Sequence, residues 1–229
     1  MAEVLLPKVF HQIWLGEKPL PDHFKRWADA WVSMNPGWRM EWWTDKHLPT
    51  LINRQEFEQA EKMAAKSDIL RYELLAQFGG IYLDSDMQPL RPIGELLGGV
   101  NAFYADERPD MPCNAIIGSV AGDPFYKAVV AALPESWRGP GDIVDKTGPR
   151  FLKRVIEQVF GADRLVEHDV CIRRRSRIRR KNGPEQLWFY DWRLFYPYYY
   201  TEEHRSGDNF PEAYGAHHWT ASWWKDGGV

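Results

Sequence analysis

Two aspartates separated by one residue end a short apolar segment, and their spacing is suited to metal chemistry. The segment reads Gly-Gly-Ile-Tyr-Leu-Asp-Ser-Asp and closes on Asp84 and Asp86. Alternate side chains of a strand share a face, so we expect Tyr82 with both aspartates and Ile81 with Leu83 on the other side. Carboxylates at the end of a buried strand need a cation, and oxygen ligands favour Mg²⁺ or Mn²⁺, which bind substrate phosphates. The segment therefore indicates a metal–diphosphate site, with two turn-forming aspartates as the structural alternative.

An apolar helical pattern over residues 67–78 leads directly into this strand. The spacing predicts a helix with Ser67 or Asp68 as its N-cap and Gly79 just beyond its C-terminus. Asp68 and Arg71 are three residues apart and share a helix face. The aspartate suits the hydroxyls of a ribose or sugar, and the arginine suits a phosphate or sugar oxygen. The alternative is an exposed ion pair within the helix, worth only ~0.3–0.5 kcal/mol.

The run from Lys66 to Asp86 closely resembles the DxD-motif sugar transferases of glycosyltransferase family 32. That family includes initiating mannosyltransferases of the yeast type, and the catalytic domains of the large clostridial glucosylating toxins are more distant relatives. Other blocks follow in the family's order: residues 7–16 look like its first strand, residues 35–45 like its second, and residues 217–223 like its closing signature. The resemblance spans most of the chain. It implies an α/β fold of the GT-A type, with a Rossmann-like, mostly parallel central sheet flanked by helices.

The resemblance also implies roles for the residues named above. Asp86 would ligate the metal directly, and Asp84 would bridge to the ribose, the sugar or a metal-bound water. Arg71 and Asp68 would orient the donor sugar, while Tyr82 would pack under the nucleotide. These side chains make up the expected catalytic set and part of the donor site.

Further donor-binding residues follow from the same resemblance: Trp14, Leu15, Ser67, Asn114, Ser222 and Trp223. Trp14 is similar to the family's nucleobase-stacking residue, although a core tryptophan would explain it as well. Asn114 lies where the family's chain passes the donor sugar, and its amide suits sugar hydroxyls, but a turn-forming asparagine is the alternative. Ser222 and Trp223 would close over the diphosphate.

Two adjacent histidines, His217 and His218, are candidates for completing the metal site. Imidazole is acceptable to Mn²⁺ beside carboxylates and less so to Mg²⁺, and the resemblance implies that one of the two binds the ion. Neighbouring side chains of an extended segment point in opposite directions, so we expect only one to face the metal, with His217 preferred. The expected cofactor is Mn²⁺, with Mg²⁺ as the alternative.

Composition is typical of one enzyme domain. The chain has 229 residues, 44% of them hydrophobic, and a net charge of −3, which argues against disorder and against nucleic-acid binding as a general function. We expect one domain over residues 1–229, with a nucleotide-binding half (1–90) and a donor-sugar and acceptor half (91–229). Cys113 and Cys171 make no disulfide framework, and no apolar run approaches the ~20 residues of a membrane span. These features favour a cytoplasmic enzyme of bacterial or phage type, or a shortened form of a longer protein.

A basic run from Arg173 to Lys181 is the largest charge asymmetry of the sequence. The run could bind an anionic acceptor, or it could contact the anionic inner face of a membrane peripherally. A solvated strand or hairpin face would explain the same run, and no nucleic-acid-binding module accompanies it.

The elements that must position these residues alternate between strand and helix, as expected for a mostly parallel sheet with ligands at the carboxyl ends of its strands. Besides residues 79–83, the predicted strands are residues 9–15, 39–44, 96–106 and 114–119. The predicted helices are residues 22–34, 51–65 as one or two helices, 67–78, 123–132 and 147–159. The last of these begins at Gly148-Pro149, which resembles the family's acceptor-side turn but also fits a helix start. Residues 169–200, rich in arginine and aromatic residues, are expected to form strands or loops.

The expected activity is metal-dependent transfer of a hexose from a nucleotide diphosphate sugar to a glycan, glycolipid or protein hydroxyl, with retention of configuration as in the relatives. UDP-sugars are favoured and GDP-mannose is the alternative donor. Competing classes are a non-catalytic carbohydrate-binding protein and a metal-dependent phosphatase or nucleotidyltransferase that uses the aspartate pair. A dehalogenase-type phosphatase would place its aspartates near the N-terminus, and a nucleotidyltransferase would bring a glycine-rich phosphate loop, which this sequence lacks.

Overall fold

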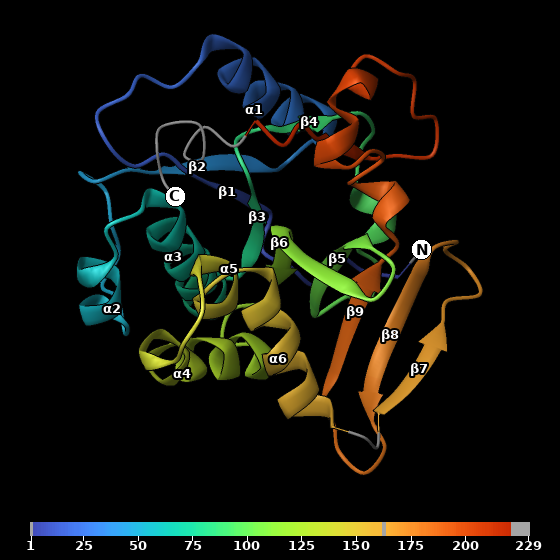
Figure 1. Cartoon of the computed structure of the whole chain (residues 1–229). Coiled ribbons are helices and arrows are strands. Elements are labelled where there is room, and N and C mark those ends of the chain that lie inside the picture. Colours follow the sequence, from blue (N-terminus) through green and yellow to red (C-terminus); the bar gives the residue numbers. More distant parts are fainter. Residues whose placement is uncertain (1, 162–163, 221–229) are drawn as a thin grey trace.

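A central sheet with helices on both faces organises the chain (Figure 1). The computed structural model describes residues 2–161 and 164–220. Within them, eight strands follow the order β2-β1-β3-β6-β5-β9-β8-β7, and β4 pairs with β10 in a separate ribbon. The strands are β1 (Val9–Ile13), β2 (Arg39–Trp43), β3 (Gly80–Leu83), β4 (Met87–Pro89), β5 (Ala102–Arg108), β6 (Met111–Ser119), β7 (Arg164–His168), β8 (Arg175–Arg180), β9 (Gln186–Tyr190) and β10 (Gly215–His217).

The predicted α/β class with a central sheet and flanking helices is confirmed. Strand β1 is parallel to both of its neighbours, β2 and β3, and β5 is parallel to β9. The pairs β3–β6, β5–β6, β8–β9 and β7–β8 are antiparallel. Strands from residues 1–90 and from residues 91–229 therefore join in one sheet.

The helices divide between the two faces of the sheet. They are α1 (Asp22–Met34), α2 (Arg54–Gln59), α3 (Met63–Phe78), α4 (Pro124–Arg138), α5 (Ile143–Lys146) and α6 (Pro149–Phe160), with the 3₁₀ turns η1 (Gly94–Leu96), η2 (Trp192–Leu194) and η3 (Tyr200–Arg205). Helices α3, α4 and α6 pack on the core that contains Tyr82, whereas Trp31 of α1 belongs to the core that contains Ile81 and Leu83. The alternation predicted for the aspartate strand is thus present, with Tyr82 on one face and its aliphatic neighbours on the other.

Helix α3 begins earlier than the sequence indicated. It starts at Met63, so Ser67 and Asp68 are buried inside it, and the prediction that one of them is the N-cap was wrong. Most of α3 from Ala65 onward is buried, so apolar residues occur on all sides and the pattern that marks a half-exposed helix is weak. The consequence is functional: Asp68 and Arg71 project from the buried part of a rigid helix rather than from its frayed start.

A second boundary also differs from prediction. The strand expected over residues 96–106 begins only at Ala102, because residues 94–96 form η1 and a turn through Gly98 and Gly99 follows it. The strand then extends to Arg108, beyond the predicted end.

Candidate active site

The two aspartates occupy the tight connection between β3 and β4. Asp84 follows the last residue of β3, and Asp86 precedes the first residue of β4. The backbone N–H of Asp84 donates to the Ala115 carbonyl at 2.8 Å, and that of Met87 donates to the Asp84 carbonyl at 3.0 Å, which closes the turn. Both aspartates are buried. The carboxylates are therefore fixed at the carboxyl end of a central strand, where α/β folds bind ligands.

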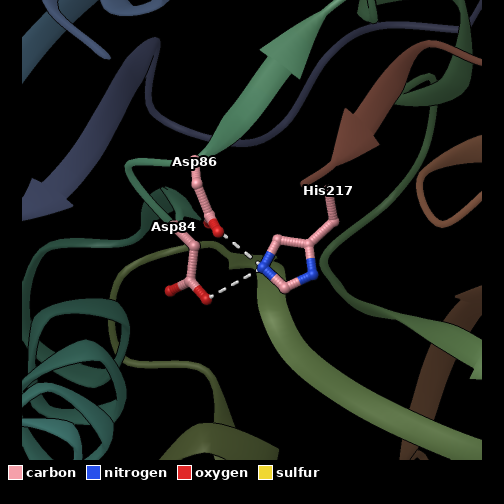
Figure 2. Close-up of side chains that lie close together, drawn as sticks. All are labelled: Asp84, Asp86 and His217. Atoms are coloured by element: carbon pink, nitrogen blue, oxygen red, sulfur yellow. Dashed lines mark ion pairs between the residues drawn. The ribbon is translucent and has the colours of Figure 1, made fainter. Parts of the chain in front are cut away.

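His217 is carried to the aspartates by the pairing of β10 with β4. The register places His217 opposite Met87, the residue that follows Asp86. Its Nε2 lies 3.1 Å from Oδ1 of Asp86 and 3.5 Å from Oδ2 of Asp84, as Figure 2 shows. One strand pair thus joins residues about 130 positions apart into one cluster.

The charges of this cluster are strongly coupled. Burial would lower the pKa of His217, but the charge of Asp86 and the hydrogen bonds to both carboxylates raise it to about 10. Burial likewise opposes ionisation of Asp86, yet the charge of His217 and the hydrogen bonds from His217 and Thr220 hold the pKa of that carboxyl well below its ordinary value. Thr220 donates its backbone N–H and its hydroxyl to Oδ2 of Asp86, each at 2.9 Å. Asp86 is therefore held as an oriented carboxylate.

These three residues fit a divalent cation. Their ligand atoms all lie within 4.8 Å of one another, and all three side chains are buried. Two carboxylates and one imidazole suit Mn²⁺ better than Mg²⁺, which prefers oxygen ligands. In addition, Nδ1 of His217 is buried without a hydrogen-bond partner among the described residues.

We name Asp84, Asp86 and His217 the metal cluster, after the ion that they fit. Arg71 links this cluster to helix α3. Its guanidinium lies 3.2 Å from Oδ1 of Asp84 and 3.2 Å from Oδ1 of Asp68, and its carbon lies 4.4 Å from the centre of the Tyr82 ring. Only 3% of its side chain is exposed. The exposed ion pair considered for Asp68 and Arg71 is thereby excluded. The tyrosine hydroxyl donates to Asp84 at 2.6 Å, so Asp84 is held from two sides.

Asp68 is in turn fixed by residues from two other elements. The amide of Asn114 on β6 donates to Oδ1 of Asp68 at 2.8 Å, and the Thr147 hydroxyl donates to Oδ2 at 2.9 Å. Tyr72 receives a second hydrogen bond from Asn114 at 3.0 Å and donates to the Thr147 carbonyl at 3.0 Å. Burial nevertheless raises the pKa of Asp68, against the opposing charge of Arg71. The network positions Asp68, Arg71 and Asn114 as one unit beside the metal cluster.

The two histidines separate as neighbours in an extended segment should. His218 turns away from the aspartates: its ring nitrogens lie 3.0 Å from the Tyr198 hydroxyl and 2.8 Å from the Gln88 side-chain oxygen, and its ring stacks on Trp27 at 4.7 Å. The structure therefore brings His217 to the aspartates and not His218. Of the two candidate ligands, His217 is therefore the one that lies with the aspartates.

Trp14 lies at the end of β1, partly buried, with its indole N–H donating to the Lys18 carbonyl at 2.7 Å. A row of rings runs from it through Phe24 and Trp27 to His218, with centroid spacings of 6.0, 5.6 and 4.7 Å. Leu15 packs against the core beside Trp14. Ser67 is buried, and its backbone carbonyl accepts from Nε of Arg71 at 3.2 Å, so its visible contribution is to hold the arginine.

Several contributors were missed from the sequence. Tyr72 and Thr147 carry the network around Asp68, and Thr220 binds Asp86. The position of Thr147 directly before Gly148-Pro149 was the one local signal available, since Pro149 does begin α6. Ser222 and Trp223, expected over the diphosphate, lie outside the described residues.

Carboxylates offset much of the charge of the basic run. Arg175 is buried and paired with Asp169. Arg177 and Arg179 share Glu167. No helix in the described parts of the chain is both long and apolar enough to cross a membrane.

Comparison with known proteins agrees with this geometry. Residues 21–107, which contain both aspartates and the Asp68–Arg71 face, match the family described as a glycosyltransferase sugar-binding region containing a DXD motif. The matched residues include the part of the chain that carries the centre of the candidate site. Among curated proteins, this chain is 29% identical to the mannosyl phosphorylinositol ceramide synthase CSH1 of Saccharomyces cerevisiae, over 67% of this chain and 43% of that protein. It is 24% identical to the initiation-specific alpha-1,6-mannosyltransferase of Candida albicans, over 82% of this chain and 60% of that protein.

The fold of this chain also has a counterpart among solved structures. The PaToxG glycosyltransferase superposes with a TM-score of 0.59 at 18% identity, covering 67% of this chain and 69% of that one. The GT-A fold expected from the sequence is thus confirmed. The chain spans less than half the length of CSH1 and about three fifths of the Candida enzyme.

Proposed function

We propose that the protein is a metal-dependent glycosyltransferase that moves a hexose from a nucleotide diphosphate sugar to a hydroxyl group of a glycan, glycolipid or protein. The observation that carries the proposal is the buried cluster of Asp84, Asp86 and His217, joined through Arg71 to Asp68 and Asn114. The cluster of Asp84, Asp86 and His217 can hold a cation together with a diphosphate. Asp68 and Asn114 offer hydrogen-bonding groups of the kind that bind sugar hydroxyls. The two lie side by side because Arg71 contacts an aspartate of each.

The residues of the chain have distinct parts in this reaction. A bound divalent ion would supply charge neutralisation for the departing diphosphate. Asp86, oriented by Thr220, and Asp84, oriented by Tyr82 and Arg71, would hold that ion together with His217. Asp68 and Asn114 would fix hydroxyls of the transferred sugar so that its anomeric carbon faces the acceptor. We expect retention of the anomeric configuration, as in the transferases that the sequence resembles.

The donor is proposed from two sources. The sequence resemblance favoured UDP-sugars with GDP-mannose as the alternative, and the names of both curated relatives refer to mannose. We therefore propose GDP-mannose as the first donor to test and UDP-glucose as the second. The ring row that begins at Trp14 would stack on the nucleobase of either.

A titration of donors tests the proposal. Calorimetry and donor hydrolysis would be measured for GDP-mannose, UDP-glucose, UDP-galactose and UDP-N-acetylglucosamine, with Mn²⁺ present and with it chelated. We expect one of these donors to bind and be turned over only with the metal. The double variant Asp84→Asn, Asp86→Asn should lose turnover by at least about 100-fold, whereas the control Asp22→Asn, Asp208→Asn, which alters two exposed aspartates, should retain it.

The same titration separates the competing classes. Metal-independent binding of free sugars without donor turnover would instead identify a carbohydrate-binding protein. Release of phosphate from simple phosphate esters would identify a phosphatase. Full turnover in the Asp84, Asp86 variant would show that the site assignment is wrong.

A further inference from the structure

A second group of aromatic residues begins beside His217 of the metal cluster. We name it the aromatic wall; it consists of Tyr196, Tyr199, Tyr200 and Trp219. The Trp219 ring lies 4.3 Å from that of His217 and 5.7, 5.4 and 6.2 Å from those of Tyr196, Tyr199 and Tyr200. The wall therefore starts in direct contact with a residue of the proposed metal site.

Trp219 is held in place by bonds on both sides. It has a positive φ of 52°, a conformation uncommon for a residue with a side chain and often found at functional sites. Its indole N–H donates to the Tyr198 carbonyl at 2.9 Å. His217, two residues before Trp219, contacts both aspartates. Thr220, the residue after Trp219, donates to Asp86. The ring is thus fixed relative to the metal cluster.

The other end of the wall is open to solvent. Tyr200 is 57% exposed, and Tyr199 and Trp219 are partly exposed. The Arg108 guanidinium lies over the Tyr199 ring at 5.5 Å. An exposed group of rings adjoining a buried charged cluster offers a surface on which a substrate can rest while one of its atoms reaches the cluster.

A carboxylate stands beside the wall at an irregularity of β5. The register between β5 and β6 shifts between Asp106 and Arg108, which places Glu107 at a bulge, a feature that redirects side chains near active sites. Its side chain is only 9% exposed. Burial raises the pKa of Glu107, while the Cys113 thiol, which donates to it, and the charges of Arg108 and His217 act in the opposite direction. Arg108 connects Glu107 to the wall, because its Nε lies 3.9 Å from Oε1 of Glu107 and its guanidinium lies over the Tyr199 ring.

The chemistry of this surface selects a class of ligand. Aromatic rings pack against the C–H face of a sugar or cyclitol, and a carboxylate accepts hydrogen bonds from its hydroxyls. An aliphatic chain would gain nothing from Glu107, whereas a hydroxylated ring can donate to Glu107 and accept from Arg108, which lies 3.9 Å from it. We infer that the aromatic wall and Glu107 form the acceptor subsite of the proposed transferase, and that the group bound there is a polyhydroxylated ring.

The ring row of Trp14 and the proposed acceptor subsite are carried by adjacent residues of the chain. The ring row of Trp14 ends at His218, whereas the wall begins at Trp219, the next residue. The donor side of the cluster is formed by Arg71 and Asp68. The inference rests on the proposed function because it assigns the wall to the acceptor of that reaction.

Direct binding tests the subsite without requiring turnover. Saturation-transfer NMR would be recorded with methyl α-D-mannopyranoside and with myo-inositol, using the full chain with Mn²⁺ and nucleoside diphosphate; the preferred probe then distinguishes a hexose from a cyclitol. Tyr200→Ala should weaken binding of the preferred ring about 3–10-fold, the range measured for loss of one aromatic contact. Tyr200→Phe, which keeps the ring, should bind normally. Phe78→Ala, which removes an exposed ring elsewhere, should also bind normally.

Transfer kinetics, measured with the donor that the titration identifies, give the second readout. Glu107→Gln and Tyr200→Ala should raise the acceptor KM about 3–10-fold and leave the donor KM and acceptor-independent donor hydrolysis unchanged. The inference is overturned if neither probe binds the unaltered protein, or if Glu107→Gln and Tyr200→Ala both bind the probes normally. It is also overturned if donor hydrolysis falls together with transfer in these variants. If no donor binds at all, the proposed function fails, and ring binding that depends on Tyr200 would still establish the wall as a sugar-binding surface.

Discussion

At the scale of single residues, the central result is that adjacent histidines have different surroundings. His217 contacts both aspartates, whereas His218 is engaged by Tyr198 and Gln88 on the other side of the segment. Both imidazoles are in reach of the same loop, yet only one has a nitrogen directed at the carboxylates. This difference provides a matched pair of variants.

We predict that His217→Ala weakens Mn²⁺ binding about tenfold or more, since even loss of a group that merely supports a ligand costs 10–100-fold. His218→Gln should leave the affinity unchanged. Calorimetric titration of MnCl₂ into each variant in the presence of nucleoside diphosphate measures both. Equal losses in the two variants would contradict the assignment of His217.

Asp106 gives a pH-dependent prediction away from the metal cluster. Burial, followed by the charges of Asp110 and Asp191, raises the pKa of Asp106 to about 7, and its Oδ1 has no hydrogen-bond partner among the described residues. Because the folded-state pKa lies above the ordinary value of 3.8, the stabilisation by this group is complete below about pH 4 and is lost as the pH rises through about 7.

Asp106→Asn should therefore become more stable relative to the unaltered protein by at least about 1 kcal/mol when the pH rises from 4.5 to 8. Urea unfolding at several pH values measures this difference, with Asp208→Asn, an exposed position, as the control. Parallel pH profiles for Asp106→Asn and the unaltered protein would show that Asp106 ionises normally.

At the scale of elements, the junction between α3 and β3 determines where the aspartates lie. Gly79 ends α3 with φ 66° and ψ −160°, a conformation essentially restricted to glycine. A Cβ there would meet Ala121 N at 2.5 Å and the Ser119 carbonyl at 2.8 Å. Gly161 ends α6 with nearly the same angles, φ 64° and ψ −164°, but a Cβ there would meet nothing within 4 Å.

This pair separates backbone strain from close packing. Gly161→Ala should lower the free energy of unfolding by about 1–3 kcal/mol through strain alone. Gly79→Ala should lower it by a further ~1–3 kcal/mol, because the backbone around Ser119 must also move. Urea unfolding of both variants gives the comparison, and equal losses would mean that the close approach at Gly79 is relieved at no cost.

At the scale of the whole molecule, charge is distributed unevenly. Residues 164–193 contain nine arginines and lysines and four aspartates and glutamates, a net charge of +5 in a chain whose total is −3. Some of these cations are structural, such as the buried Arg175. Others are exposed, including Arg173, Arg179 and Arg180, at 83%, 43% and 54% of their side-chain areas. Contact with an anionic membrane at its inner face therefore stays a prediction, carried by the exposed cations and not by the whole run.

We predict that the variant with Arg173, Arg179 and Arg180 each replaced by Gln binds phosphatidylserine vesicles more weakly, by about 1 kcal/mol per charge. Co-sedimentation measures it, and the control variant replaces the exposed Arg54, Arg91 and Arg150 in the same way. Identical binding of the two variants would remove the basis for a membrane contact through this run.

Local sequence determined the parts of this protein that depend on neighbours in the chain. The alternation around Tyr82, the two aspartates after a buried strand and the Asp68–Arg71 spacing were readable because strand and helix periods are local properties. The alternation of strands and helices predicted the α/β class, and the resemblance to the DxD-motif transferases was needed to choose these residues as the centre of the candidate site. The extent of α3 was misjudged at its start, because a helix buried on most sides lacks the half-polar pattern that marks a boundary.

Tertiary structure decided which residues complete the site. Selection of His217 over His218 depends on the register of β10 with β4. Arg71 is held by the Asn114 carbonyl of β6, and Asp68 is held by Thr147 ahead of α6. The approach of Trp219 to His217 depends on the positive φ of Trp219. The approach of Glu107 to the wall depends on the bulge between β5 and β6. Apart from the Trp219–His217 contact, these contacts join segments that are tens to more than a hundred residues apart. Their formation is set by packing of the whole chain, which no local pattern encodes.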